Sequence, residues 1–229
     1  MTRGPKPTGD AGSPPCLAAE IAPDYFDPLG VDARQAADVA RWRKARRGEL
    51  LLARAALSIA DRQSAAARIG DHLDRLLEDR FADLSGKVIS GYWPIKAEPD
   101  LRGWMARCLA LGASLALPEV EETNRPLVFR PWRPGAAMRR GHWNIPVPDT
   151  AETLTPDIVL APLVGWDAGG YRLGYGGGYF DRTLARIHPF AIGVGLSAGR
   201  LASIYPQPHD VGLDAIVTEA GVDYLRDRV

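Results

Sequence analysis

The residues best suited to chemistry lie in the stretch from Tyr171 to Arg182, which reads YRLGYGGGYFDR. Four glycines fall within positions 174–178, so the backbone there is free to adopt a positive φ and to approach a ligand closely. An apolar run at 158–164 predicts a buried strand before this stretch, and helix-forming residues at 179–187 predict a helix after it. Bare N–H groups beside a helix start favour a phosphate group, so the pattern indicates a phosphate-binding loop.

Charged side chains strengthen this interpretation. Arg172 and Arg182 place positive charge on both sides of the glycines, and Asp181 offers a carboxylate oxygen of the kind that Mg²⁺ prefers. The stretch contains no G-x-x-x-x-G-K-[ST] motif, and Tyr179 stands where the dinucleotide fingerprint G-x-G-x-x-G needs its third glycine. The alternative is a tight turn with solvated charges, which is what most glycine runs are.

A second group of chemically useful residues spans positions 92–100, with the sequence YWPIKAEPD. Its aromatic residues can stack on a flat ring, and Lys96, Glu98 and Asp100 add a cation and two carboxylates. Ligands of open α/β sheets lie beyond the carboxyl ends of the strands, and both groups follow predicted strands. We therefore expect the two loops to face one site, the alternative for 92–100 being a proline-rich turn with surface charges.

The elements that must position these loops alternate between strand and helix, which predicts an α/β fold with three layers, a mixed, mostly parallel sheet flanked by helices. A basic cluster at 41–47 lies in the first predicted helix, and Ser58 begins a capping-box pattern that predicts the start of the second. Four helices are expected, at 32–57, from the Ser58 cap through Leu77, at 101–111 and at 179–187. Six strands are expected, at 88–93, 114–117, 127–130, 158–164, 191–196 and 215–217. The strand at 127–130 is expected as an antiparallel edge.

The composition places the chain among soluble globular proteins, with 229 residues, 46% of them hydrophobic, and a formal net charge of +0. A zero net charge argues against a nucleic-acid surface, and the absence of an 18-residue apolar run or a signal-peptide pattern argues against a membrane span or secretion. We expect a cytoplasmic monomer or small homo-oligomer, with a proline- and glycine-rich arm at 1–30 and a single domain at 31–229. Cys16 and Cys108 have neither metal-binding nor disulfide spacing.

Several motifs occur together in a characteristic order. The stretch Arg172 to Leu184 matches the pattern R-L-G-x-G-x-G-Y-[YF]-D-x-x-L, and positions 145–148 match an Ile-Pro-x-Pro turn. With these motifs, the chain resembles the 5-formyltetrahydrofolate cyclo-ligase family, also called 5,10-methenyltetrahydrofolate synthetases, from roughly residue 40 to the end. The other matching segments are the basic helix at 44–47 with 54–58, the segment 93–101, and a terminal motif that contains His209, Asp210, Asp214 and Thr218.

The resemblance implies an ATP- and Mg²⁺-dependent enzyme that closes 5-formyltetrahydrofolate to 5,10-methenyltetrahydrofolate and releases ADP and phosphate. It implies that Asp181 binds Mg²⁺ and that Arg172, Asp181 and Lys44 are catalytic. The residues implied to bind ATP are Lys44, Arg47, Arg172, Gly174, Tyr175, Gly176, Gly177, Gly178 and Tyr179. Those implied to bind the reduced folate are Trp93, Ile95, Glu98, Asp100 and Tyr175, with the two carboxylates on the amino-pyrimidine edge of the pterin.

The chain departs from the family pattern at a few positions. Phe180 replaces a tyrosine of the glycine loop, Pro99 and Leu101 interrupt a Glu-Val-Asp-Thr segment, and Val147 stands where many members have Glu. Two alternatives to the cyclo-ligase therefore stay open. One is an ATP-using paralogue that acts on a different formamide- or amide-like substrate, and the other is a non-catalytic module that binds a nucleotide or a folate.

Overall fold

The computed structural model of the protein describes residues 33–227. The arm expected at 1–30 lies outside the described residues. Within the described range, no helix is both long and apolar enough to cross a membrane. The helices are α1 (Ala33–Ala55), α2 (Ile59–Arg80), α3 (Arg102–Ala110) and α4 (Tyr179–Ile187).

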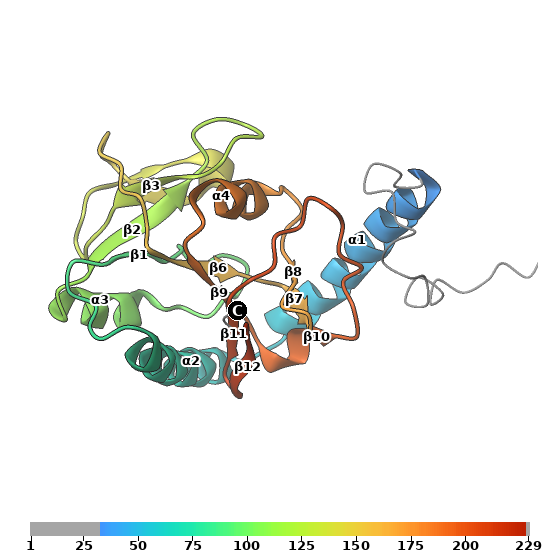
Figure 1. Ribbon diagram of the computed structural model, residues 1–229, viewed down its shortest axis with the longest axis horizontal. Helices are drawn as coiled ribbons and strands as arrows, with labels where there is room; N and C mark the ends of the chain where they lie inside the picture. Colours follow the sequence, from blue (N-terminus) through green and yellow to red (C-terminus); the bar gives the residue numbers. More distant parts are fainter. Residues whose placement is uncertain (1–32, 228–229) are drawn as a thin grey trace, which may run out of the picture.

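Seven strands form the central sheet (Figure 1). Along the chain they are β1 (Val88–Ser90), β2 (Ser114–Glu119), β3 (Val128–Pro131), β6 (Ile158–Pro162), β9 (Phe190–Val194), β11 (Ala215–Thr218) and β12 (Gly221–Leu225). Their order in the sheet is β12–β11–β9–β6–β1–β2–β3. The pairs from β2 across to β11 are parallel, whereas the two edge strands, β3 and β12, pair antiparallel. The predicted mixed, mostly parallel sheet with an antiparallel edge at β3 is therefore confirmed.

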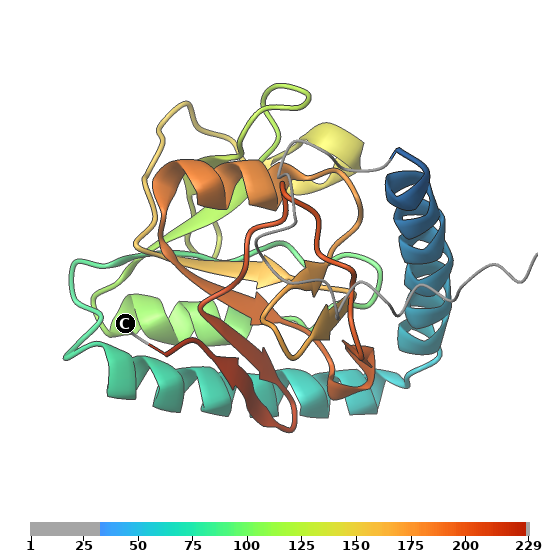
Figure 2. The ribbon, with the colours of Figure 1, turned by 45° about the vertical axis from the view of Figure 1, so that its right-hand side comes forward.

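Helices cover both faces of this sheet, as the predicted three-layer fold requires (Figure 2). α2 and α3 cover one face, and α4 covers the other. Alternate residues of β6 face opposite layers: Ile158 and Leu160 pack into the core under α2 and α3, while Val159 and Ala161 pack into the core under α4. Because both faces of β6 are buried, its sequence is a continuous apolar run.

α1 does not belong to these layers and stands beside the loops that follow β1 and β6 (Figure 2). Among its residues with described burial, only Val39 and Arg54 are buried, so the helix has no apolar stripe to pack. It is attached instead by hydrogen bonds from Arg43, Arg47 and Arg54 to the rest of the domain. Arg43 and Arg47 of the basic cluster thus face the domain, whereas Arg41 and Arg46 pair with Asp38 and Glu49 of the same helix.

The start of α2 confirms the predicted capping box. Ser58 has an extended backbone, and its Oγ accepts a hydrogen bond from the Asp61 N–H at 3.1 Å. The Ser58 hydroxyl in turn donates to the Asp61 carboxylate at 2.7 Å. These bonds satisfy an N–H group that the first turn of a helix leaves without a partner, and they fix the corner between α1 and α2.

The glycine loop is reached through a hairpin that the sequence did not predict. The strand expected at 158–164 ends at Pro162, and β7 (Gly165–Asp167) and β8 (Arg172–Leu173) then pair antiparallel. The turn between them is closed by Asp167, whose Oδ1 accepts hydrogen bonds from the N–H groups of Gly169 and Tyr171. The loop therefore follows β8 and not the central strand itself.

Other differences from the predicted elements are small. The strand expected at 88–93 ends at Ser90, because the chain then turns through Lys96 and Ala97, which both have positive φ. The strand expected at 191–196 spans Phe190–Val194. The remaining elements are the antiparallel ribbon β4 (Met138–Arg140) and β5 (Pro146–Pro148), β10 (Arg200–Leu201), and the 3-10 turns η3 (His142–Asn144) and η4 (Ser197–Gly199).

Candidate active site

The glycine loop forms an open cradle at the N-terminus of α4. Gly176 and Gly178 have φ of 96° and 64°, a backbone region that disfavours residues with a Cβ atom. A Cβ atom on Gly177 would lie 2.8 Å from a ring carbon of Tyr179, so a larger residue would displace that ring. Within the described residues, the N–H groups of positions 174–177 meet no hydrogen-bond acceptor. The loop therefore presents bare donors beside a helix start, which suits a phosphate group.

Arg172 and Asp181 form a buried ion pair under this loop. The Arg172 side chain is 4% exposed, and its guanidinium lies 2.9 Å from Asp181 Oδ1. It also donates to the Val211 carbonyl, while the Val211 N–H donates to Asp181 Oδ1 at 3.2 Å. Burial lowers the pKa of Arg172, and the Asp181 charge opposes that change. The pair ties α4 to the segment before β11, and Asp181 Oδ2 has no contact within the described residues.

The substitution at Phe180 fits this ion pair. The Arg172 guanidinium carbon lies 5.8 Å from the centre of the Phe180 ring, in a cation–π contact. A phenyl ring covers a buried guanidinium without bringing a hydroxyl that would need its own partner. The loss of the family's tyrosine hydroxyl is thus explained by packing beneath the loop.

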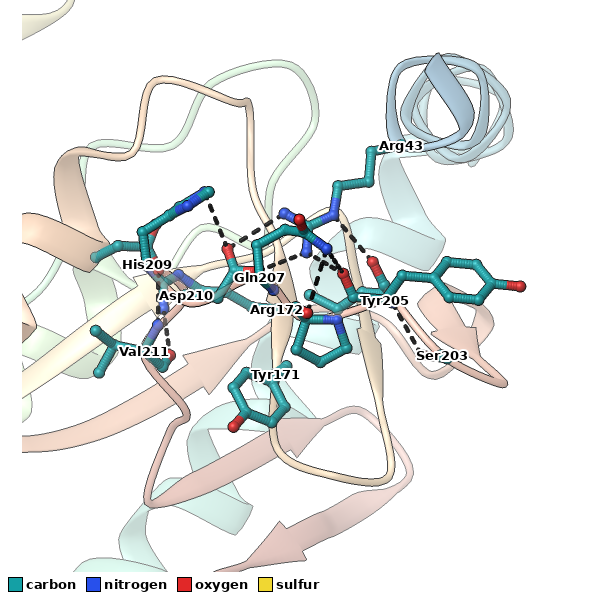
Figure 3. Close-up of polar contacts among 12 residues, drawn as sticks. Arg43, Tyr171, Arg172, Ser203, Tyr205, Gln207, His209, Asp210 and Val211 are labelled. Carbon is teal, nitrogen blue, oxygen red and sulfur yellow. Dashed lines mark hydrogen bonds and ion pairs between the residues drawn. The ribbon is translucent and has the colours of Figure 1, made fainter. Parts of the chain in front are cut away.

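A second buried ion pair fixes α1 to the same part of the domain (Figure 3). The Arg43 guanidinium donates to both carboxylate oxygens of Asp210, at 2.5 and 3.2 Å, and the two side chains are 14% and 10% exposed. It also donates to the carbonyls of Ile204 and Tyr205. Arg43 was not among the site residues expected from the sequence, although its spacing of four from Arg47 places the two on one helix face.

Arg47 and Lys44 occupy different positions on α1. Arg47 Nε donates to the Gly174 carbonyl at 2.6 Å, and its guanidinium lies over the loop, near the position that a Cβ atom of Gly176 would take. Burial, followed by the nearby charge of Arg43, lowers the pKa of Arg47. Lys44 is exposed and makes no hydrogen bond within the described residues. The structure therefore brings Arg47 to the glycine loop and leaves the Lys44 ammonium free on the flank of the helix.

A hydrogen-bonded chain connects the glycine loop with the loop at 92–100. The Tyr175 hydroxyl donates to Glu98 Oε1 at 2.8 Å and accepts from an Arg54 guanidinium nitrogen at 2.5 Å. Arg54, only 6% exposed, also donates to the carbonyls of Lys96 and Leu163. One arginine of α1 thus holds the ends of both loops, and the two loops expected to face one site are in contact.

Glu98 is the buried carboxylate of this chain. It is 5% exposed, and its Oε2 accepts from the Ile95 N–H at 2.9 Å. Burial raises the pKa of Glu98, against the hydrogen bonds from Ile95 and Tyr175 and the charges of Arg54 and Lys96. The pKa of Tyr175 is also raised, by burial first and then by the Glu98 charge.

Asp100 is placed differently from Glu98. Asp100 is half-exposed and forms a salt bridge with Arg102 at 2.5 Å, and the Arg102 guanidinium lies over the Trp93 ring, 4.6 Å from its centre. These hydrogen bonds with Arg102 lower the pKa of Asp100. The two carboxylates therefore diverge, Glu98 facing Tyr175 and Asp100 facing the first turn of α3.

Trp143 lies beside the glycine loop and was not among the residues expected there from the sequence. It is 62% exposed, with φ of 54°, and it lies in the 3-10 turn between β4 and β5. Its ring packs edge-on against Tyr179 at 5.6 Å between centres and lies next to Gly177. A large exposed aromatic residue in a left-handed conformation is rare, and here it lies at the rim of the glycine loop. No pattern in the sequence signals this, because the ribbon that carries Trp143 was not predicted.

Comparison with known proteins assigns the family. The family model described as "5-formyltetrahydrofolate cyclo-ligase family" matches residues 39–219. The chain belongs to this family. A 5-formyltetrahydrofolate cyclo-ligase of Mycolicibacterium smegmatis is 33% identical over 154 residues, which cover 62% of this chain and 79% of the relative. One of Haemophilus influenzae is 29% identical, over 60% of this chain and 75% of the relative.

Solved structures agree with this family assignment. The NMR structure of the 5,10-methenyltetrahydrofolate synthetase of Aquifex aeolicus aligns with a TM-score of 0.69 and 30% identity, over 82% of this chain and 94% of that protein. A synthetase of Mycoplasma pneumoniae aligns with a TM-score of 0.61 and 24% identity, and this likeness concerns the fold alone. The cyclo-ligase family thus shares this α/β architecture, and the chain is an enzyme of the ligase class.

Proposed function

We propose that this enzyme closes 5-formyltetrahydrofolate to 5,10-methenyltetrahydrofolate at the expense of ATP, with Mg²⁺ as cofactor. The observation that supports this most is the junction of the two loops, where Tyr175 of the glycine loop bonds to Glu98 of the 92–100 loop. A loop suited to phosphates and a loop suited to a flat, hydrogen-bonding ring therefore meet at one point. Family membership supports the same reaction.

The chemical problem is that a formamide carbon is a poor electrophile, because the nitrogen lone pair is delocalised into the carbonyl. The formyl oxygen attacks the γ-phosphorus, the bond from γ-phosphorus to the β–γ bridging oxygen breaks, and ADP leaves. N10 then attacks the activated carbon, loses its proton, and phosphate leaves with the former formyl oxygen. Such a reaction needs positioning and charge neutralisation more than covalent participation by the protein.

The residues of this chain divide these tasks between the two loops. The N–H groups of the glycine loop from Gly174 to Tyr179 hold the phosphates together with Arg47, whose side chain lies at the loop, and Lys44 of the same helix adds a second positive charge. Arg172 stabilises the glycine loop through its buried ion pair with Asp181 of α4. At the other end, Glu98 receives the amino-pyrimidine edge of the pterin, and the folate-binding residues there are Trp93, Ile95, Glu98, Asp100 and Tyr175. Trp143 lies at the rim of the glycine loop, and we assign to it the part of the folate that meets this loop.

Asp181 fits the role of a magnesium ligand. Its two contacts within the described residues both use Oδ1, which leaves Oδ2 free for a cation. Among the described residues, no group of three or more His, Cys, Asp or Glu side chains could hold a metal ion by itself. That suits Mg²⁺, which is usually held by one or two carboxylates together with substrate phosphates and water. When bound, the ion would neutralise charge that develops on the phosphoryl oxygens.

The departures from the family pattern favour the cyclo-ligase over a paralogue with another substrate. Leu101 is 2% exposed and belongs to the core under α2 and α3. Val147 is also buried, packed against Gly141 in the β4–β5 ribbon. Pro99 keeps a carbonyl that accepts a hydrogen bond from Tyr92. These three substitutions therefore act on packing and leave the loop contacts of Glu98 and Tyr175 intact.

The test of the proposed function is direct. The protein is incubated with Mg-ATP and 5-formyltetrahydrofolate, and formation of the methenyl product is followed by its absorbance band. Growth of the band that requires both ATP and the protein supports the cyclo-ligase. ATP hydrolysis stimulated by another formyl compound, without the band, would indicate the paralogue, and nucleotide binding without hydrolysis would indicate the non-catalytic module.

We predict that Arg47→Ala and Lys44→Ala each lower ATP-dependent turnover, by about 30 to 1,000-fold, because each removes a charge-assisted contact worth about 2–4 kcal/mol in the transition state. The melting temperature of Lys44→Ala should stay unchanged, because that side chain is exposed. The matched control is Arg46→Ala on the same helix, whose side chain pairs with Glu49 away from the loop. Full activity of an Arg47→Ala, Lys44→Ala double variant would contradict this role.

We also predict that Trp143→Gly raises stability while it weakens folate binding. Glycine removes a side chain from a left-handed position, where a residue with a Cβ atom costs about 1–2 kcal/mol. The same change removes an exposed ring from the rim of the loop, so the KM for folate should rise about two- to tenfold, which corresponds to loss of an aromatic contact worth about 0.5–1.5 kcal/mol. Urea denaturation and steady-state kinetics measure the two effects. A fall in stability, or an unchanged KM, would show that Trp143 serves only to pack against its neighbours His142 and Tyr179.

A further inference from the structure

Arg182 has a position in α4 that the stability of the helix does not explain. It lies at the end of the first turn, where a positive charge is unfavourable because the N-terminal end of the helix dipole is itself positive. Its Nε is buried and has no hydrogen-bond partner among the described residues, which is a further cost. In that part of the chain its guanidinium also pairs with no carboxylate. A side chain held at such cost suggests a role in function.

The contacts that Arg182 does make are with the glycine loop and its end. A terminal guanidinium nitrogen donates a hydrogen bond to the Gly177 carbonyl at 2.7 Å. The guanidinium carbon lies 5.0 Å from the centre of the Tyr179 ring, in a cation–π contact. The other terminal nitrogen lies 2.9 Å from the position that a Cβ atom of Gly178 would take. The side chain therefore reaches back from α4 to the last peptide unit of the loop.

This hydrogen bond fixes the direction of a neighbouring donor. The Gly177 carbonyl and the Gly178 N–H belong to one planar trans peptide unit, so they point in opposite directions. Because Arg182 holds the carbonyl, the Gly178 N–H is directed away from Arg182. That N–H meets no acceptor within residues 33–227, and it lies at the N-terminus of α4. Arg182 therefore orients a bare donor of the kind that binds a phosphate group.

The orientation of this peptide unit needs such a contact, because both of its flanking residues are glycines. A residue without a Cβ atom adopts positive and negative φ about equally readily, so the unit could rotate by half a turn at little cost. The Gly177 carbonyl oxygen would then take the place of the Gly178 N–H. A carbonyl oxygen there would repel a phosphate oxygen. The backbone freedom that allows close approach to a ligand thus requires a side chain that selects one of the two orientations.

We propose that Arg182 is a positioning residue of the ATP site, which keeps the Gly178 N–H directed at the phosphates through its hydrogen bond to the Gly177 carbonyl. This inference rests on the proposed function, because it takes the glycine loop to bind the phosphates of ATP. Arg182 acts through the loop and does not itself touch the nucleotide. A phosphate bound at the helix end would also compensate the Arg182 charge, which the positive end of the helix dipole disfavours.

The test compares three variants of α4. Arg182→Met removes the donor and should weaken binding of a non-hydrolysable ATP analogue with Mg²⁺ about tenfold in calorimetry, and raise the KM for ATP similarly, with the KM for folate unchanged. The loss relative to the native protein should persist at about 0.5 M salt, which screens a charge but does not restore a peptide orientation. Arg182→Lys keeps a donor for the carbonyl and should restore most of the affinity. The matched control is Arg186→Met, whose exposed side chain makes no hydrogen bond or ion pair with other described residues, and it should bind as the native protein does.

The binding measurement separates this inference from the proposed function, because binding of the analogue requires no folate. Native affinity in Arg182→Met, or a loss that disappears at high salt, would overturn the positioning role while the cyclo-ligase stands. Equal rises in the KM for ATP and for folate, with a lower melting temperature, would show that Arg182 only stabilises α4 and would overturn it as well. If the native protein forms no methenyl product, the analogue still decides: weaker binding in Arg182→Met with recovery in Arg182→Lys supports the inference, and no binding to the native protein overturns it.

Discussion

Asp181→Asn should reduce turnover by at least about 100-fold, the scale seen when an electrostatic contact to the transition state is lost, while the KM for folate changes little. The asparagine amide has almost the shape of the carboxylate but does not provide the charged oxygen that Mg²⁺ needs. Because Asp181 lies beyond the glycine loop and its contacts within the described residues are with Arg172 and Val211, the folate end of the site should be undisturbed. Steady-state kinetics at saturating Mg-ATP measures both quantities.

The same substitution should also destabilise the fold. The Arg172 guanidinium is buried, and breaking a buried ion pair by removing one partner costs about 3–5 kcal/mol. Since Asp181 is one-fifth exposed and asparagine can still accept a hydrogen bond, we expect a loss near the lower end of that range. The midpoint of urea denaturation measures it.

A double variant separates stability from chemistry. Arg172→Met with Asp181→Leu removes both charges and leaves no unpaired one, so most of the lost stability should return. Activity should not return if the Asp181 carboxylate holds the cation. Recovery of turnover in the double variant, or equal losses of folate affinity and turnover in Asp181→Asn, would mean that the pair only supports the loop.

The parts of the fold that were predicted correctly are those in which local pattern and burial agree. The helix expected at 179–187 has those bounds, because the glycines end just before it and His188 caps it in a left-handed conformation. The strand expected at 158–164 was evident and forms over Ile158–Pro162, because burial on both faces makes it wholly apolar. The β7–β8 hairpin and the β4–β5 ribbon were missed, since strands of two or three residues leave too few positions for any periodicity to show.

In the candidate site, too, some features could be predicted from the sequence and others could not. The sequence placed a glycine loop and the 92–100 loop at strand ends, and the structure brings them into contact through Tyr175 and Glu98. Arg54 could not be found by such reasoning, because its acceptors at Lys96 and Leu163 are 42 and 109 positions away in the chain. Arg43 and Lys44 are neighbours in a basic run, and only the docking of α1 shows that Arg43 faces the domain.

Arg54→Met should lower kcat/KM by about 100-fold, although Arg54 is not expected to touch either substrate. The change leaves the Lys96 and Leu163 carbonyls and the Tyr175 hydroxyl without their donor, and each buried unpaired group costs about 1–3 kcal/mol. Both loops would then lose their common support, and a misplacement of about 1 Å is enough to cost about 100-fold in rate. Arg54 is therefore a positioning residue that acts through Tyr175 and Glu98.

The pH dependence distinguishes this role from simple loss of packing. The ionisable groups around Glu98 in the described residues include Arg54 from α1, Tyr175 from the glycine loop, and Lys96 and Tyr92 from its own segment. Burial raises the pKa of Glu98, and the Arg54 charge opposes the rise, so Arg54→Met should raise that pKa further. If the ionised carboxylate receives the pterin, the acid limb of the kcat/KM profile should move to higher pH in Arg54→Met.

The stability of the protein should follow the same titration with a defined sign. A carboxyl group whose pKa is raised by folding favours the folded state fully at pH values below its ordinary pKa, near 4.5. That contribution is lost as the pH rises through the raised pKa of the folded state. In Arg54→Met the loss should extend to higher pH than in the native protein, as measured by urea midpoints across a pH series.

Arg54→Lys is the matched control, because it keeps the positive charge but cannot supply the planar set of donors that reaches three acceptors at once. It should restore most of the native pH profile while leaving much of the rate defect. A native pH profile in Arg54→Met, together with reduced stability, would show that Arg54 contributes only to packing. The two variants thus separate the charge that sets the ionisation of Glu98 from the hydrogen bonds that hold the loops together.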